Sequence, residues 1–242
     1  MNESTLDTLA VVISAFWNNS TPAIQSSFNH KTFYAELKKI FDAEPDFLKK
    51  LSAVDDLIDE NPEIASLREY IVDLLFIHFF NEDVLRLDED YLETPEWENI
   101  EDKTIDRGTE FLNLHLYIKE CNEEEEEPEV SHFLKEFLLV DEDEFQDEYE
   151  IYEQVIANQI LVEAEQSEIA KVYKTVPANT DIKEVFYPMM SFFSNTIFDQ
   201  KYFDEYVQYS DNKAYDAAIL AGLYSYHHGN GLFSKSFLNC KD

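Results

Sequence analysis

The residue pattern closest to a chemical site is a set of three side chains, Glu129, His132 and Glu136. At this spacing they share one side of a helix, where two carboxylates and an imidazole could bind a metal ion. Di-iron helical bundles, however, combine two Glu-x-x-His pairs with two further glutamates on facing helices. The chain has one such pair, on the side of the helix opposite its apolar face. We therefore predict no metal site and no cofactor.

Two acidic clusters, Asp88–Asp90 and Asp141–Glu144, suggest calcium binding at first sight. An EF-hand loop needs Gly at its sixth position, where the chain turns sharply, and a bidentate Glu at its twelfth. Counting from Asp88 or from Asp141 meets neither requirement. A specific calcium site is therefore not indicated at either cluster.

Motifs of nucleotide-binding proteins and of common hydrolases are missing from the sequence. There is no GxGxxG, no Walker A, no HExxH and no GxSxG. No histidine is followed by Asp, and Arg107 and His115 are farther apart than the Arg and His of HEPN-type ribonucleases. His78 and His115, each between apolar neighbours, are typical of core histidines. An enzyme of unrecognised type, with the histidines as first candidates, is the third of our hypotheses.

The charge of the chain is large, negative and unevenly distributed. The net charge is -34, and residues 51–100 carry 15 acids and 2 bases, while residues 101–150 carry 19 acids and 4 bases. Such a surface repels nucleic acids and anionic membranes, and it attracts basic proteins. A net charge of about 2–8 is enough to keep a small domain soluble. The excess favours binding to a basic partner over a purely solubilising role.

Aromatic residues gather in the C-terminal third of the chain, with 7 Phe and 7 Tyr between Phe186 and Phe237. Tyr202, Phe203, Tyr206 and Tyr209 recur at helical spacing. Aromatics at this spacing mostly form a core, but a row of tyrosines can also form a recognition surface. A helical scaffold or adaptor that uses this region is the second functional hypothesis.

The elements that must carry these residues are predicted to be helices. The chain has only 4 Gly, too few for the many tight turns of a sheet protein. Thr21-Pro22, Asn61-Pro62 and Thr94-Pro95 each place a capping side chain before a Pro at the first helical position. Apolar residues recur at intervals of three and four, and no segment alternates with a period of two. We predict an all-α, compact assembly of about nine or ten helices without significant sheet.

Three further predictions concern individual helices. A long helix is expected from about Phe145 to Tyr173, and another begins near Asn212 and stops at Gly229. Pro188 should kink or break a helix spanning about residues 181–195, because proline lacks the N–H that the helix needs.

The acidic run at residues 123–129 divides the chain in the predicted domain organisation. Five adjacent glutamates repel one another and are usually solvated, so we predict an acidic loop there. An N-terminal helical lobe would cover residues 1–122, and an aromatic-rich C-terminal lobe residues 130–242. A single domain over residues 1–242 is the alternative.

The cellular context is predicted from cysteines and from the N-terminus. Cys121 and Cys240 are too few for a disulfide scaffold in a chain of 242 residues. Acidic residues precede the apolar stretch Leu9–Trp17, whereas a signal peptide begins with basic ones, and this stretch is too short to span a bilayer. We expect a cytoplasmic protein without membrane contact.

These observations favour a non-catalytic acidic protein that occupies a basic surface of a partner. A nuclease or another nucleic-acid-binding protein is the natural partner, because its groove already accepts phosphates. The chain would then act as an inhibitor, an immunity protein or a nucleic-acid mimic that does not itself bind nucleic acid. The residues predicted to contact the partner are Asp88, Glu89, Asp90, Glu93, Glu98, Asp141, Glu142, Asp143 and Glu144.

Overall fold

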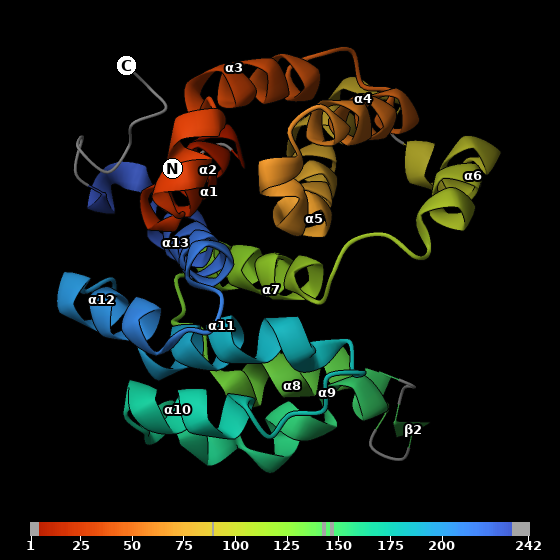
Figure 1. The fold of residues 1–242 in the computed structure, drawn as a ribbon. Helices are drawn as coiled ribbons and strands as arrows, with labels where there is room; N and C mark the ends of the chain where they lie inside the picture. The colour runs from red at the N-terminus through yellow and green to blue at the C-terminus, as the bar shows by residue number, and fades with distance from the viewer. Residues whose placement is uncertain (1–4, 89, 142–143, 146–147, 234–242) are drawn as a thin grey trace.

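The computed structural model describes residues 5–88, 90–141, 144–145 and 148–233. The all-α prediction is confirmed: these residues form thirteen α-helices, short 3-10 and π segments and one two-stranded antiparallel ladder (Figure 1). The number of helices exceeds the predicted nine or ten. The helices are α1 Thr5–Asn19, α2 Pro22–Ser27, α3 His30–Phe41, α4 Phe47–Asp59, α5 Arg68–His78, α6 Pro95–Thr104, α7 Phe111–Glu124, α8 Val130–Leu138, α9 Glu148–Ala157, α10 Gln166–Tyr173, α11 Ile182–Ser194, α12 Gln200–Tyr209 and α13 Lys213–His228, and the strands are β1 Leu139–Asp141 and β2 Glu144–Phe145.

Two of the three predicted cap-and-proline starts cap an α-helix. The Thr21 hydroxyl oxygen accepts the Ile24 N–H at the start of α2, and that of Thr94 accepts the Trp97 N–H at the start of α6. Asn61 behaves differently, because its side-chain amide donates to the Leu57 carbonyl at 2.8 Å. Pro62 consequently opens a 3-10 segment, η1 (Pro62–Leu67), which leads into α5.

The first and last helices lie side by side at the centre of the molecule (Figure 1). Gly222 of α13 permits this approach, since a Cβ atom at this position would lie 2.8 Å from Val12 Cγ2 of α1 and 2.5 Å from the hydroxyl of Tyr70. The predicted bounds of α13 are confirmed, because Asn212 precedes the helix and Gly229 ends it with a φ of 87°.

The remaining helices lie on both sides of this central pair. In Figure 1, α3 lies above α1 and α13, α4, α5 and α6 lie to their right, and α8, α9, α10 and α11 lie below. Buried apolar side chains from Leu6 to Phe233 form one continuous hydrophobic cluster. None of the helices in the described part of the chain is long and apolar enough to cross a membrane.

The predicted long helix between Phe145 and Tyr173 is wrong. Phe145 belongs to β2, and the rest divides into α9, the 3-10 segment η5 (Gln159–Glu163) and α10. Asn158 leaves the helical conformation with a φ of −120°, and its side-chain amide donates to the Gln154 carbonyl at 2.7 Å. The division lets α9, η5 and α10 each contact α11.

Helix α11 continues through Pro188, so the helix is not broken there, and the kink that was the other predicted outcome stays a prediction. Its flanking residues Tyr187 and Met189 are fully packed in the core. Burial of this apolar helix compensates for the backbone hydrogen bond that proline cannot donate.

In the acidic run, Glu123 and Glu124 complete the last turn of α7, and Glu125 adopts a left-handed conformation with a φ of 60°. Residues 126–129 connect to α8 without regular structure. Glu127 accepts a hydrogen bond from Thr196 at 3.2 Å and lies 3.6 Å from His227 Nε2. The connection therefore contacts the end of α13.

Candidate functional site

The predicted contact residues fall into two places in the fold. Asp88 and Asp90 precede the short 3-10 segment η4 (Tyr91–Glu93), which ends at Glu93, and Glu98 lies on α6; all four are exposed. Asp141 and Glu144 face each other as backbone partners in the β1–β2 ladder. Glu89, Glu142 and Asp143 lie outside the described residues.

Around the first group, the structure adds acids that the sequence analysis did not single out. Helix α6 buries Trp97, Ile100 and Thr104, whose spacing of three and four leaves its acidic positions on the outside. That spacing could have identified them from the sequence. None of the acids between residues 88 and 106 that the structure describes forms an ion pair. These exposed residues, which we call the acidic segment, are Asp88, Asp90, Glu93, Glu96, Glu98, Glu101, Asp102 and Asp106.

The acidic segment lies at the outer edge of the fold, where an extended connection joins α6 to α7 (Figure 1). Its contact with the core is aromatic: Trp97 stacks on Phe79 with ring centroids 5.4 Å apart and meets Phe80 edge-on at 5.6 Å. One side of α6 is therefore fixed by packing, and its acidic side is left free for solvent.

A buried ion pair lies just before the acidic segment. Lys50 Nζ of α4 contacts Asp83 Oδ2 at 2.5 Å and donates to the Phe41 carbonyl at 2.6 Å. His78 Nε2 hydrogen-bonds the same carbonyl at 2.9 Å. Burial lowers the pKa of His78 against the opposing effect of Glu82, so this imidazole is neutral at pH 7. The chain leaves the core through the π-helical turn η2 (Phe79–Asp83).

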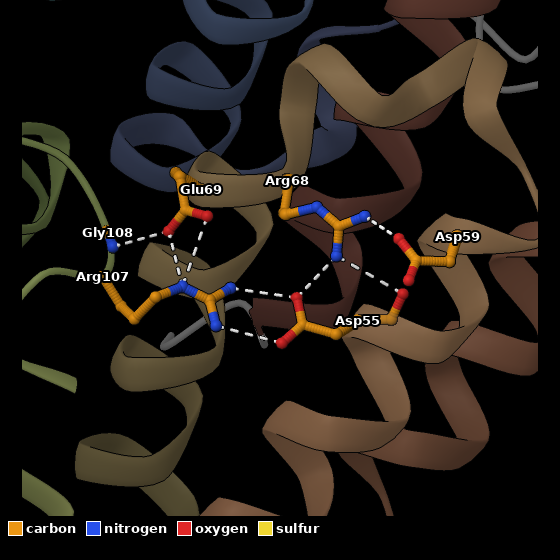
Figure 2. A network of polar contacts seen from close by, with 6 residues as sticks. All are labelled: Asp55, Asp59, Arg68, Glu69, Arg107 and Gly108. Carbon is orange, nitrogen blue, oxygen red and sulfur yellow. Dashed lines mark hydrogen bonds and ion pairs between the residues drawn. The ribbon is translucent and has the colours of Figure 1, made fainter. Parts of the chain in front are cut away.

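An arginine–carboxylate network lies where the acidic segment ends (Figure 2). Arg107 donates two parallel hydrogen bonds to Asp55, each 3.0 Å long, and a third to Glu69 at 3.0 Å. Arg68 donates to Asp55 at 2.6 Å and also to Asp59. Burial tends to raise the pKa of Asp55, but the two guanidinium groups outweigh it and hold that pKa below its usual value. The network joins α4, α5 and the connection to α7.

The two residues after Arg107 are fixed by the same face of α5. The Gly108 N–H donates to Glu69 at 2.9 Å, and the Thr109 N–H and hydroxyl donate to Asp73 at 2.8 and 2.6 Å. Asp73 is fully buried, and burial raises its pKa well above the usual range, although the Thr109 hydrogen bonds act against this. Both ends of the acidic segment are thus held to α4 and α5, so its position relative to the core is well defined.

A polar cleft of about 930 Å³ opens beside this network. Its walls come from the connection that carries Arg107, from α5 and α7 on one side, and from α11 and α13 on the other. The charged and aromatic residues that line it include Arg68, Glu69, Tyr70, Asp106, Arg107, Glu110, Asp181, Lys183, Glu184 and Tyr215.

The pattern closest to a metal site has other contacts. The Glu129 N–H donates to the Tyr117 hydroxyl at 3.0 Å, and His132 Nδ1 lies 3.5 Å from the same hydroxyl. Across the part of the chain that the structure describes, no three acidic, histidine or cysteine side chains are grouped to hold a metal ion. His115 is buried and pairs with the Tyr70 hydroxyl at 3.0 Å, and burial lowers its pKa to about 3.

The aromatic row of the C-terminal third belongs largely to the core. Phe203 and Tyr206 are buried, and the Tyr206 hydroxyl donates to the Asp216 carbonyl at 3.1 Å. The Tyr202 hydroxyl donates to the Ser191 carbonyl at 2.6 Å. Of the row, Tyr209 alone is exposed, at 42%. The row therefore supplies packing and buried hydrogen bonds more than an external surface.

Comparisons with known proteins give no relative from which a function could be carried over. No protein-family model, no curated protein and no solved structure matches this chain.

Proposed function

We propose that this chain is a non-catalytic acidic binding protein whose acidic segment occupies a basic surface of a partner protein. One observation carries the proposal: the carboxylates between Asp88 and Asp106 in the described structure are exposed and have no ion-pair partner. Like charges this close repel one another. A basic surface would replace that repulsion with attraction and would speed encounter.

The way the segment is anchored supports the same function. An acidic tail without fixed structure would lose conformational entropy when it binds, which weakens affinity. Here the Lys50–Asp83 pair and the Arg107 network hold the two ends, and Trp97 packs the middle. A pre-organised row of carboxylates avoids much of that entropic cost.

The partner class follows from the sign of the charge and from the chemistry of carboxylates. A nuclease, or another protein that binds nucleic acid, presents a groove that accepts a row of phosphates. Carboxylates can accept the same charge-assisted hydrogen bonds from arginine and lysine. An inhibitor, an immunity protein or a nucleic-acid mimic would act in this way, and the acids of the β1–β2 ladder, Asp141 and Glu144, would extend the surface.

The test compares capture by the native chain with capture by two variants of equal net charge. The first variant carries D90N, E93Q, E98Q and E101Q in the acidic segment. The control carries four neutralisations among exposed acids of the region around α9 and α10: E153Q, E163Q, E165Q and E168Q. Proteins retained from a lysate of the native host are identified by mass spectrometry, and the affinity of the main candidate is then measured with purified components.

We expect a basic protein whose affinity falls at least ten-fold for the segment variant and less than two-fold for the control. Inhibition of a nuclease by the native chain, relieved in the segment variant, would identify the mechanism. Equal losses in the two variants, or none, would overturn the proposal, because binding would then depend on total charge or on another surface.

A further inference from the structure

We infer that the cleft beside the arginine–carboxylate network receives an arginine side chain of the basic partner. This inference rests on the proposed function and adds to it an anchoring site with a defined chemistry. The cleft continues directly from the acidic segment, since Ile105 and Asp106 form part of its wall. Ile105 is 83% exposed, so it offers an apolar contact for the stem of an incoming side chain.

Two of the three cations of the cleft are paired with carboxylates, and the third, Lys183, is turned toward backbone carbonyls. Arg107 is paired with Asp55 and Glu69, and Arg68 is paired with Asp55. Lys183 Nζ donates to the carbonyls of Tyr173 and Val176 at 2.6 and 3.0 Å. It also lies 3.9 Å from the centre of the Tyr173 ring.

Three acidic side chains in the cleft wall are free to bind a ligand. Glu110 is engaged by the Tyr152 hydroxyl and by the side-chain amide of Asn113. Asp106, Asp181 and Glu184, in contrast, are exposed and take part in no ion pair within the described part of the chain. They stand on different walls, one at the end of the acidic segment and two at the start of α11. A cation held in the cleft could therefore meet carboxylates from two sides.

The hydroxyl of Tyr215 provides independent evidence that a polar ligand belongs in the cleft. Tyr215 of α13 is only 5% exposed and lines the cleft, and no hydrogen bond joins its hydroxyl to another described residue. Burial, together with the charges of Glu184 and Asp216, raises its pKa well above 10, so it stays neutral. A hydroxyl in a cleft wall that no other side chain occupies is available to hydrogen-bond a ligand. Its oxygen can accept an N–H from a cation.

Arginine fits these groups better than lysine does. A guanidinium has five donors in a planar fork, so one group can reach carboxylates on two walls and a hydroxyl between them. An ammonium is a compact, strongly hydrated charge with three donors. The planar guanidinium, unlike the ammonium, can also stack on an aromatic ring.

The test uses the full chain and small probes, so it does not depend on the identity of the partner. N-acetyl-arginine amide, N-acetyl-lysine amide and N-acetyl-citrulline amide are titrated at low salt, and binding is followed by NMR chemical-shift changes. We expect the arginine probe to bind at least five-fold more tightly than the lysine probe, and the uncharged citrulline probe not to bind. The shifts should map to residues around the cleft.

Three variants separate the cleft from the general negative charge. D181N with E184Q should weaken arginine binding at least ten-fold, and Y215F, which removes only the hydroxyl, at least three-fold. E101Q with D102N removes the same charge from the exposed side of α6, outside the cleft, and should change binding less than two-fold. Circular dichroism verifies that each variant is folded.

Equal binding of the arginine and lysine probes, or equal effects of the two double variants, would overturn the inference. The proposed function fails separately. If the arginine probe binds in the cleft but neutralising the acidic segment leaves partner capture unchanged, the proposed function is wrong and the cleft assignment stands. If partner capture depends on the acidic segment while no probe binds in the cleft, the cleft assignment is wrong and the proposed function stands.

Discussion

Gly108 occupies a position that other residues would fill at a cost. Its φ is +86°, and a Cβ atom there would lie 2.5 Å from Asp73 Oδ1. The glycine thus allows the end of the acidic segment to lie close against the buried carboxyl that holds Thr109. Backbone conformation and the hydrogen bonds of Asp73 depend on the same small residue.

We expect Gly108→Ala to lower the free energy of unfolding by about 2–4 kcal/mol, because left-handed strain adds to the loss of hydrogen bonds around Asp73. Urea unfolding measured by circular dichroism would provide the value. Gly231→Ala is the matched control, since a Cβ there meets no atom within 4 Å. Equal stability of the two variants would mean that the Asp73 contact does not constrain this turn.

Asp216 should make stability depend on pH. Burial and the charges of Asp211 and Glu184 raise its pKa to about 7, against the hydrogen bond from Ser210 at 2.5 Å. Between about pH 4 and 7 the folded chain therefore keeps a proton that the unfolded chain releases. Stability must fall as the pH rises through this window. Asp216→Asn cannot ionise and should remove this part of the loss, on the order of 2–4 kcal/mol.

Urea unfolding at pH 4.5 and 7.5 gives the loss in the free energy of unfolding between the two pH values for the native chain and for Asp216→Asn. The difference between the two losses is the contribution of Asp216. Asp204→Asn serves as the control, because it removes an exposed acid of α12. If the native chain and Asp216→Asn lost the same stability between the two pH values, the pKa of Asp216 would not be raised in the folded protein.

At the residue scale, the sequence identified charge but not pairing. The spacing within a helix reveals which positions share a face, so the exposed acids of α6 could have been predicted from Trp97 and Ile100. The network of Arg107 with Asp55 joins residues 52 positions apart, and Asp73 meets Thr109 across 36. No local pattern encodes such contacts, because they depend on how α4 and α5 pack together.

At the scale of elements, local signals predicted the helix ends well where a backbone constraint is strong. Proline after a capping threonine and the glycine at position 229 marked true ends, since both act through φ and backbone hydrogen bonds. The helix expected between Phe145 and Tyr173 failed for the opposite reason. Its apolar spacing continues through Asn158, but packing against α11 favours three short segments. Pro188 shows the same competition, because burial keeps α11 intact around it.

At the scale of the whole molecule, the excess negative charge is concentrated in one stretch of the chain, part of which lies at the outer edge of the fold. Residues 51–150 hold most of the excess acid, and they include α6 and the connections around it at the outer edge. The central helices α1 and α13 hold few charges and form the core. The prediction of a charged middle between less charged ends could be made from composition alone. The anchoring of the acidic segment at both of its ends required the structure.

The last prediction concerns salt, which should act with opposite signs on the isolated chain and on its complex. In isolation, unpaired carboxylates of the acidic segment repel one another, and this repulsion disfavours the folded state. The Debye length falls from about 30 Å at 0.01 M salt to about 10 Å at 0.1 M, so added salt should raise the melting temperature. In the complex the same carboxylates face a basic surface, and screening should lower the affinity, mainly through slower association. Thermal melts and binding kinetics over one salt series test both effects. An affinity that holds or rises with salt would leave the acidic segment as a solubilising feature and would remove the basis for the proposed function.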